Sequence, residues 1–378
     1  MAFRVLLVGG GSGGHVYPLI AVAHALQVAA QKSGIALQLR MMGDGPIFER
    51  AAKENGIPYS TIIAPKLRRY ASAGNITDIF KIPLALVQSL AKVFFFMPDA
   101  VFAKGGYTCA FPTLAARFYM IPVFLHESDS VPGLANRILA KRSKLIFTSF
   151  ATADEFFKRA GRTTMLTGNP FRPELCCVER GAAHEALKLN PARKTLLVIG
   201  GSLGAQQLND VVLNGLVQIL QKGYQVIHQT GEKNYETVKK SIEQYMVEGK
   251  DSYAPLIASS YRVYPFLDQS QLATVYGAID VAVTRASAGV LTELAYAGKP
   301  MIVVPLPGSA NDHQVMNAAE MSRFGAVVMD GANMSVQVLL SQLERIVEPT
   351  AYAELSTKIR AFAKSDAADT IAQVILAG

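Results

Sequence analysis

The chain has 378 residues, of which half are hydrophobic and 17% are charged, and this composition excludes a long disordered or fibrous protein. Its length exceeds that of one ordinary hydrophobic core and predicts two domains. The formal net charge of +8 favours anionic partners, namely phosphate-rich ligands, an anionic membrane surface or nucleic acid. Charge by itself does not choose among the three.

The N-terminus, the apolar segments and the cysteines all fit a cytoplasmic protein. The first residues, MAFRVLLVGG, resemble a β-strand followed by glycines and differ from a secretory signal peptide. No stretch reaches the roughly 18 uninterrupted apolar residues of a membrane-spanning helix. The three cysteines, Cys109, Cys176 and Cys177, lack the spacing of a metal site or of a disulfide framework, which fits a reducing compartment.

In the first half of the chain, short apolar strands alternate with longer helical patterns. We expect strands over 3–9, 37–42, 59–63, 100–103, 122–126 and 144–148, and helices over 15–30 and 49–54. This alternation predicts a parallel sheet covered by helices.

A polar stretch over 178–194 precedes a second beginning, TLLVIGGSLGAQQLN (195–209), which repeats the order of strand, glycines and helix. Later strands are expected over 224–230, 280–284, 301–305 and 326–330. We therefore predict an α/β protein of two Rossmann-like domains whose parallel sheets face a cleft with their carboxyl strand ends. The predicted domains are 1–169 and 170–350, with a helical segment 351–378 that packs back on the first.

The first glycine loop, GGGSGGHVYP (9–18), contains a G-x-G-x-x-G pattern. Backbone N–H groups and a helix N-terminus at such a loop favour a phosphate. A dinucleotide site would also need an acid at the end of the second strand, but that strand ends in Arg40, Met41 and Met42. The loop therefore favours a phosphate-rich ligand over NAD.

His15 follows the last glycine of this loop, at the start of the predicted helix. The positive end of a helix disfavours the imidazolium, which keeps the side chain neutral, as a general base must be. A histidine with only a local hydrogen bond is the alternative. Two further glycine turns, KGGYT (104–108) and GGSLG (200–204), also follow predicted strands, and three such loops favour a phosphate-rich ligand.

Polar side chains follow other predicted strands. HESDSVPGLANR (126–137) places Glu127 and Asp129 after a strand, and an ordinary loop with capping acids is the alternative. In GNPFRPEL (168–175), Arg172 is either a phosphate clamp or a surface arginine.

The segment TRASAGVLTELAYAGKPMIVVP (284–305) is the most informative one. Small residues over 286–289 permit a ligand to approach closely, and Glu293 is placed to hold vicinal ribose hydroxyls. In NDHQVMNAAEM (311–321), the amides of Gln314 and Asn317 suit sugar hydroxyls. Capping and surface roles are the alternative for these polar residues.

Segment 66–97 combines five basic residues with one acid, Asp78, and the apolar run IPLALVQSLAKVFFFM. This composition fits a helix that lies on an anionic membrane. A core helix with solvated lysines is the alternative.

In order and spacing from Val5 to Asp330, these motifs together resemble the MurG-type family of peptidoglycan N-acetylglucosaminyltransferases, in glycosyltransferase family 28. The resemblance implies the glycosyltransferase B fold. It implies that N-acetylglucosamine moves from UDP-N-acetylglucosamine to the 4-hydroxyl of undecaprenyl-diphosphoryl-N-acetylmuramoyl-pentapeptide, which converts lipid I to lipid II in peptidoglycan synthesis. It further implies an inverting reaction with no cofactor or metal, a peripheral position at the cytoplasmic face of the inner membrane, and no nucleic-acid partner.

The resemblance also implies roles for single residues. The implied catalytic base is His15, with Glu127 second. The implied substrate-binding residues are Ser12, Gly13, Gly14, Tyr107, Asp129, Arg172, Ser202, Leu267, Ala288, Gly289, Val290, Leu291, Thr292, Glu293, Gln314 and Asn317. Among them, Glu293 is implied to bind the ribose, the backbone of Leu267 the uracil, and Gln314 and Asn317 the sugar. The family usually has threonine at Ser12 and asparagine at Asp129, so this chain carries an additional acid near the sugars.

Other functions fit the sequence less well. Retaining transferases of this fold carry two glutamates eight residues apart, whereas the residues eight away from Glu293 are Arg285 and Met301. A UDP-N-acetylglucosamine 2-epimerase would lack the basic and apolar segment 66–97. An oxidoreductase would need the missing ribose acid, and a non-catalytic nucleotide-binding subunit would not release UDP.

Overall fold

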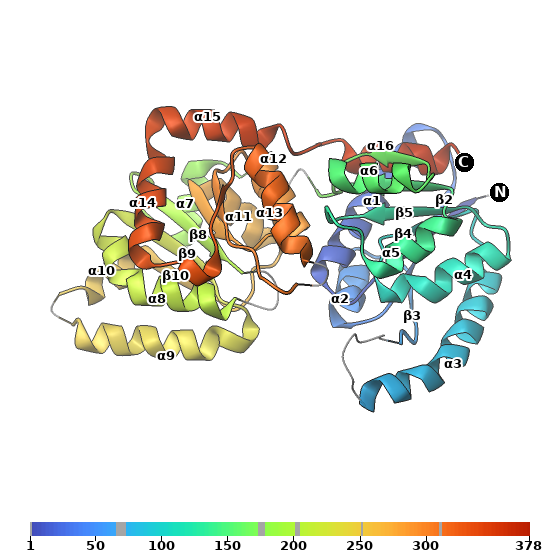
Figure 1. Cartoon of the computed structure of the whole chain (residues 1–378), viewed down its shortest axis with the longest axis horizontal. Helices are drawn as coiled ribbons and strands as arrows, with labels where there is room; N and C mark the ends of the chain where they lie inside the picture. Colours follow the sequence, from blue (N-terminus) through green and yellow to red (C-terminus); the bar gives the residue numbers. More distant parts are fainter. Residues whose placement is uncertain (1, 66–72, 173–177, 201–204, 251, 310–311) are drawn as a thin grey trace. The chain divides into compact units, whose positions relative to one another are not determined.

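A computed structural model describes residues 2–65, 73–172, 178–200, 205–250, 252–309 and 312–378, with the backbone alone over 73–77. The chain divides into two compact units (Figure 1). Unit 1 comprises Met1–Phe171 and Lys364–Gly378, and unit 2 comprises Arg172–Ala363. Each unit is a parallel α/β fold, which confirms the predicted fold class.

Unit 1 is built on a seven-stranded parallel sheet with the order β3-β2-β1-β4-β5-β6-β7. Its strands are β1 (Phe3–Val8), β2 (Leu37–Gly43), β3 (Tyr59–Thr61), β4 (Ala100–Ala103), β5 (Val123–Glu127), β6 (Leu145–Thr148) and β7 (Thr164–Leu166). Its helices are α1 (Gly13–Lys32), α2 (Pro46–Glu54), α3 (Ala73–Phe96), α4 (Ala110–Phe118), α5 (Leu134–Leu139), α6 (Ala151–Arg159) and α16 (Ala367–Leu376), with short 3-10 turns η1 (Tyr107–Cys109) and η2 (Ala140–Arg142).

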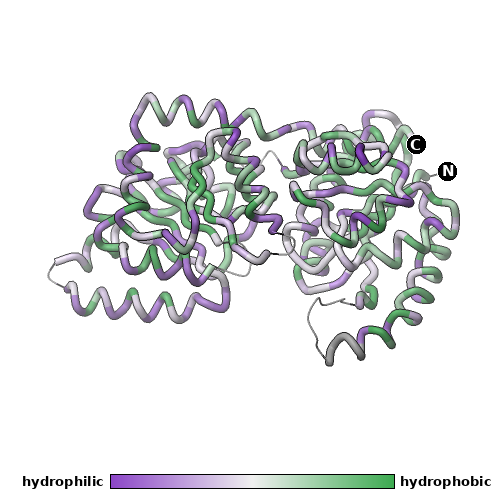
Figure 2. Tube along the Cα trace, viewed as in Figure 1, coloured by the Kyte–Doolittle hydropathy of each residue, from purple (hydrophilic) through white to green (hydrophobic). Residues whose placement is uncertain are grey.

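Both faces of this sheet are buried, and β1 shows why its sequence is continuously apolar. Val5 and Leu7 pack in one core with α1, α2 and α16, whereas Leu6 and Val8 pack in a second core with α3 and α4. Strands buried on both faces are typical of parallel sheets between helices. Figure 2 shows the strands as hydrophobic traces enclosed by helices that carry the polar residues.

Helix α3 is apolar on two sides. Ala85, Ser89, Val93 and Phe96 form a buried stripe at helical spacing, on the side where α3 packs against α4. Large apolar side chains at other positions are exposed, among them Phe80, Leu84, Val87, Phe94 and Phe95. Within the described ranges, its segment Asp78–Phe96 is the one helix long and apolar enough to cross a membrane by length and composition. Because one stripe is already buried against unit 1, the helix lies on that unit as an amphipathic surface element.

Unit 2 repeats the plan with a six-stranded parallel sheet of order β10-β9-β8-β11-β12-β13. Its strands are β8 (Lys194–Ile199), β9 (Tyr224–Gln229), β10 (Tyr261–Tyr264), β11 (Val281–Thr284), β12 (Met301–Val303) and β13 (Val327–Val328). Its helices are α7 (Arg180–Leu187), α8 (Gln206–Gln221), α9 (Glu232–Glu248), α10 (Ala254–Ser260), α11 (Gln269–Ala278), α12 (Ala288–Tyr296), α13 (His313–Arg323), α14 (Val336–Val347) and α15 (Pro349–Arg360), with the 3-10 turn η5 (Gly331–Asn333).

The observed division differs from the predicted one at the C-terminus. Residues 351–378 are not one returning segment, because α15 packs on α12 and α14 in unit 2. There Arg360 donates to the carbonyls of Tyr296 and Ala297, and Ile359 is buried. The chain returns to unit 1 at Lys364, whose ammonium donates to the Leu166 carbonyl, and α16 then packs against α1.

Candidate functional site

The parallel register brings the predicted motifs of unit 1 to one edge of its sheet. Val8 pairs with Ala103, and Ala103 pairs with Leu125. Gly9 and Lys104 therefore follow β1 and β4 at the same carboxyl edge, and His126 lies beside them near the end of β5. Loops at this edge bind the ligands of open α/β sheets.

The glycine loop between β1 and α1 packs tightly against the end of β2. A Cβ on Gly10 would lie 2.6 Å from the Asp44 carbonyl oxygen, and the Gly11 amide donates to the same oxygen at 3.1 Å. The backbone of Asp44 thus occupies the space beside the loop. Ser12 is the N-cap residue of α1. Gly13 and Gly14 are the first two residues of this helix and lie at its positive end.

His15 is the third residue of α1 and lies over the second glycine turn. Its Nε2 is 3.6 Å from the position that a Cβ on Gly106 would take. Gly106 has φ +83°, a conformation that favours glycine, and it leads directly into Tyr107. The Tyr107 hydroxyl is 3.3 Å from the corresponding Cβ position of Gly11. The structure therefore brings together the predicted residues of the first two loops.

Glu127, the last residue of β5, is turned into its own loop. Its carboxylate accepts hydrogen bonds from the amides of Asp129 (3.0 Å) and Gly133 (3.1 Å) and from the side-chain amide of Asn136 (2.8 Å). Burial, and then the charge of Asp129, raise the pKa of Glu127, and these hydrogen bonds oppose the rise. Both carboxylate oxygens thus hold the loop, whereas Asp129 is half-buried at its start.

A buried polar cluster behind this loop was not predicted from the sequence. Lys104 is fully buried, and its amine contacts His126, Ser128 and Asn169. A lysine directly after a continuously apolar strand was the available signal, since a charged side chain is rarely buried without partners.

The sheet of unit 2 has a carboxyl edge that corresponds to the one in unit 1. Ile199 pairs with Thr284, and Thr284 pairs with Val303, so the chain leaves β8, β11 and β12 at one side. Ser202 belongs to the loop after β8 and lies outside the described residues. Arg172, the first residue of unit 2, is half-buried.

The predicted nucleotide segment forms the first turns of α12, whose N-cap residue is Ser287. Leu291 and Thr292 are buried, whereas Gly289 faces open space. Glu293 accepts a 2.6 Å hydrogen bond from the Tyr276 hydroxyl. Burial raises the pKa of Glu293 to about 7, and the bond from Tyr276 opposes this rise.

The remaining predicted contacts of unit 2 differ in exposure. Leu267 is buried just before α11. Gln314 accepts a hydrogen bond from the Leu306 amide at 3.0 Å. Asn317 is fully buried and donates to the Ala286 carbonyl at 3.0 Å, which supports the turn before α12.

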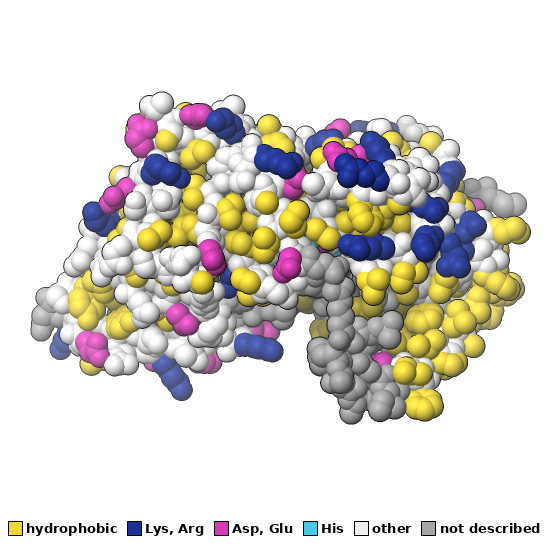
Figure 3. Space-filling model, in the orientation of Figure 1, with side chains coloured by type: hydrophobic (Ala, Val, Ile, Leu, Met, Phe, Trp, Pro, Cys, Tyr) yellow, Lys and Arg dark blue, Asp and Glu magenta, His cyan; other side chains and the backbone are white. Residues whose placement is uncertain are grey.

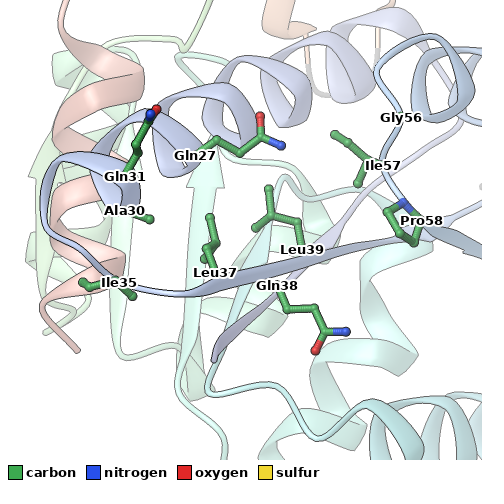
Figure 4. Close-up of a pocket in the computed structure, with 10 residues that line it drawn as sticks. All are labelled: Gln27, Ala30, Gln31, Ile35, Leu37, Gln38, Leu39, Gly56, Ile57 and Pro58. Atoms are coloured by element: carbon green, nitrogen blue, oxygen red, sulfur yellow. The ribbon is translucent and has the colours of Figure 1, made fainter. Parts of the chain in front are cut away.

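A hollow of about 410 Å³ lies elsewhere in unit 1, between the end of α1 and the strand β2 (Figure 4). It is lined by Gln27, Ala30, Gln31, Ile35, Leu37, Gln38, Leu39, Gly56, Ile57 and Pro58. These residues are amides and apolar groups, and none of the predicted site residues is among them. The hollow is separate from the carboxyl edge of the sheet.

Comparisons with known proteins agree with both halves of the chain. Residues 5–148 match the glycosyltransferase family 28 N-terminal domain, and residues 195–374 match the glycosyltransferase family 28 C-terminal domain. The UDP-N-acetylglucosamine–N-acetylmuramyl-(pentapeptide) pyrophosphoryl-undecaprenol N-acetylglucosamine transferase of Treponema denticola is 35% identical over 333 residues, which cover 85% of this chain and 82% of that protein. The protein of the same name from Salinibacter ruber is 32% identical over 377 residues, 99% of this chain and 96% of that protein.

Solved structures share the fold over the full length. The crystal structure of Acinetobacter baumannii MurG matches with a TM-score of 0.72 and 26% identity, and the match covers 100% of both chains. A UDP-GlcNAc 2-epimerase from Neisseria meningitidis, bound to UDP-GlcNAc, matches with a TM-score of 0.69 at 14% identity over both whole chains. The second likeness concerns the fold alone.

Proposed function

The chain belongs to glycosyltransferase family 28, and from this premise we propose that it transfers N-acetylglucosamine from UDP-N-acetylglucosamine to the 4-hydroxyl of undecaprenyl-diphosphoryl-N-acetylmuramoyl-pentapeptide. The reaction converts lipid I to lipid II in peptidoglycan synthesis. The observation that carries the proposal is the position of the motifs: in each unit they lie on loops and helix N-termini at the carboxyl edge of a parallel sheet.

Unit 2 is the donor half-site in this proposal. Glu293 holds the ribose hydroxyls, the first turn of α12 approaches the nucleotide closely at Gly289, and the backbone of Leu267 contacts the uracil. Gln314 contacts the sugar, and Asn317 supports that contact through the turn at Ala286. Arg172 and Ser202 bind the diphosphate, where a guanidinium and the N-terminus of α8 would stabilise the negative charge that grows as UDP leaves.

Unit 1 is the acceptor half-site. The acceptor 4-hydroxyl oxygen attacks the anomeric carbon and gives its proton to His15. The bond from that carbon to the β-phosphate oxygen breaks, UDP leaves with the electron pair, and the configuration inverts. The position of His15 at the positive end of α1 favours the neutral imidazole that this step needs. Ser12, Gly13, Gly14 and Tyr107 line the same edge.

Glu127 ranks second to His15 as the base. Its two oxygens already accept three hydrogen bonds from its own loop, so it acts as the support of that loop and of Asp129.

The direct test is incubation of the protein with labelled UDP-N-acetylglucosamine and a lipid I analogue. We expect UDP release and a labelled disaccharide–lipid product. No transfer, under conditions in which an enzyme of known activity is active, would show the proposal to be wrong.

The assignment of His15 has its own test. His15→Ala is expected to lower kcat by about 10²–10⁴-fold, the range for loss of a general base. UDP affinity should stay unchanged because the nucleotide belongs to unit 2. Turnover within a few-fold of the parent enzyme, with folding intact, would remove His15 from this role.

We also propose that unit 1 binds the cytoplasmic face of the inner membrane through an apolar surface. We define this surface as the exposed side of α3 together with Phe118, the last residue of α4, and Met120, which follows α4. Phe80, Phe95, Phe118 and Met120 are 79%, 82%, 72% and 86% exposed. Figure 3 shows hydrophobic side chains gathered over α3 and α4. Lys81 and Arg117 are exposed on the same two helices, and such basic groups attract anionic lipid.

A further inference from the structure

Lys104 is the most deeply buried cation in the described part of unit 1. It follows β4 directly, its side chain has no exposed surface, and its amine lies 2.7 Å from His126 Nδ1 and 3.1 Å from Asn169 Oδ1. It also donates to the Ser128 hydroxyl. A lysine ammonium has three donors and accepts nothing, so three partners satisfy it completely. Burying such a group is costly, and a complete set of partners is what makes it tolerable.

These contacts tie together three segments of unit 1. Lys104 directly follows β4, His126 and Ser128 belong to the end of β5 and its loop, and Asn169 lies just before the chain enters unit 2. His126 Nε2 is 3.1 Å from the Gly168 carbonyl oxygen. Because a carbonyl only accepts, Nε2 carries the hydrogen and Nδ1 is left to accept from Lys104. His126 is thus fixed in one neutral tautomer, and burial and the Lys104 charge keep its pKa well below the usual range.

The charges around Lys104 are mainly acidic. Burial lowers the pKa of Lys104 to about 7, while the charges of Glu127 and Asp129 oppose that shift. His15 lies within electrostatic range of His126. Burial raises the pKa of Glu127, and repulsion by the charge of Asp129 raises it further. Lys104 donates to Ser128, which lies between Glu127 and Asp129 in the chain, so its ammonium is a positive charge close to both acids.

We propose that Lys104 is a positioning residue of the acceptor half-site, where its ammonium fixes the loop after β5 against Gly168–Asn169 and acts as the counter-ion of Glu127 and Asp129. The inference rests on the proposed function, because it concerns the loop that carries Asp129. It also explains how this chain tolerates an acid at position 129, where its family usually has asparagine.

The test separates charge from packing with four variants. Lys104→Met removes the ammonium at similar length, Asp129→Asn removes one acid at nearly constant shape, and the double variant does both. Asn169→Ala removes one partner of the amine but keeps its charge. The pH dependence of kcat/KM for transfer, and of urea unfolding, is measured for each.

In Lys104→Met, Glu127 loses its counter-ion and its pKa should rise. Because a protonated Glu127 holds the loop that carries Asp129 less well, the acidic limb of kcat/KM should move to higher pH. In the double variant the limb should move most of the way back, because Asp129 no longer repels Glu127. Asn169→Ala should lower stability and leave the limb in place. The proposal would be overturned if the limb moved as far in Asn169→Ala as in Lys104→Met, or if adding Asp129→Asn to Lys104→Met did not move it back. Either result would mean that Lys104 acts only through packing.

Urea unfolding gives a readout that needs no transfer. The unfolded chain holds the Lys104 proton up to about pH 10, whereas the folded chain loses it as the pH rises through about 7, so the ammonium acts as a counter-ion mainly below that pH. Lys104 therefore makes stability rise with pH above 7, and Lys104→Met should lose that rise. Loss of the rise in a protein without transferase activity would contradict the proposed function but not the burial of an ionisable Lys104.

The parent protein offers a measurement that no folding defect can obscure. Nitrogen NMR of the His126 ring should show a protonated Nε2 and an unprotonated Nδ1 at every pH from about 5.5 to 8.5. An Nδ1–H tautomer, or an imidazolium within this range, would mean that Lys104 does not donate to His126, and the proposal would fall.

Discussion

At the scale of single residues, Tyr276 controls the ionisation of Glu293, the residue proposed to bind the ribose. Its hydroxyl donates to Glu293 at 2.6 Å and stabilises the carboxylate against burial. Tyr276→Phe should therefore raise the pKa of Glu293 further and weaken UDP binding at least tenfold at pH 7, since a hydrogen bond to a charged group contributes about 1.5–3 kcal/mol. Isothermal titration calorimetry with UDP measures this change.

The matched control for Tyr276→Phe is Tyr245→Phe. Tyr245 is a partly buried residue of α9 in the same unit, remote from α12 in sequence and in packing. It should bind UDP like the parent protein. Equal affinities of the two variants would exclude Tyr276 from positioning Glu293.

The pKa of Glu293 also predicts how nucleotide affinity depends on pH. Because that pKa is raised to about 7, the carboxyl is protonated below this value and cannot accept from both ribose hydroxyls. UDP affinity should therefore increase from pH 6 to pH 8, by at most about tenfold per pH unit on the acidic side. Glu293→Gln should bind weakly with no such dependence, and a pH-dependent Glu293→Gln would assign the effect to another group.

Sequence patterns found those site residues whose roles come from their place in the chain. His15 and Ser12 stand where a helix begins after a strand, and Glu293 stands one turn inside a helix after small residues. Lys104 and Tyr276 could not be found in this way. Their partners lie 22 and 17 residues away or more, so only the folded register of the strands and helices brings the groups together.

At the scale of elements, α3 carries the prediction for the membrane. Phe80→Ser combined with Phe95→Ser removes two exposed rings from the apolar surface and should reduce binding to anionic phospholipid vesicles at least tenfold, because burial of one such side chain contributes about 1.5–3 kcal/mol. Sedimentation with vesicles measures the loss. Added salt should also weaken vesicle binding by the parent protein, since basic groups flank the apolar surface.

The control for α3 is Val247→Ser, which changes a residue of α9 that is 78% exposed in unit 2. It should leave vesicle binding unchanged. Transfer to a water-soluble acceptor analogue should be unaffected in the α3 variant, because neither ring belongs to the carboxyl edge. Vesicle binding equal in all three proteins would contradict the proposed apolar surface.

Elements were predicted best where the strands are central and apolar. The expected strand over 100–103 matches β4, and those over 122–126 and 144–148 match β5 and β6 within one residue at each end. The strands β7 and β10, which lie at sheet edges, were not predicted. β7 reads Thr-Met-Leu, and β10 is only partly buried, so neither shows the continuous apolar run that marks a central strand.

At the scale of the whole molecule, each unit has its own pair of cores, one on each face of its sheet. Helix α16 belongs to unit 1 although it follows unit 2 in the chain, and it buries Ile371 and Ile375 with α1. The C-terminal helix should therefore stabilise the unit that is encoded first. Nucleotide binding should stabilise the other unit, because a ligand that binds only the folded state shifts the unfolding equilibrium of its own site.

Scanning calorimetry of the full chain distinguishes the two contributions. Ile371→Ala should destabilise unit 1 by about 2–5 kcal/mol, as for other buried aliphatic truncations, and lower one transition by roughly 5–15 °C. Ile346→Ala is the matched control, since Ile346 is fully buried in α14 of unit 2 and should lower the other transition. UDP should raise the unfolding temperature of the transition that Ile346→Ala lowers. It should not change the transition that Ile371→Ala lowers. If UDP raised the Ile371-sensitive transition instead, the nucleotide would belong to unit 1, and the assignment of donor and acceptor to the two units would have to be exchanged.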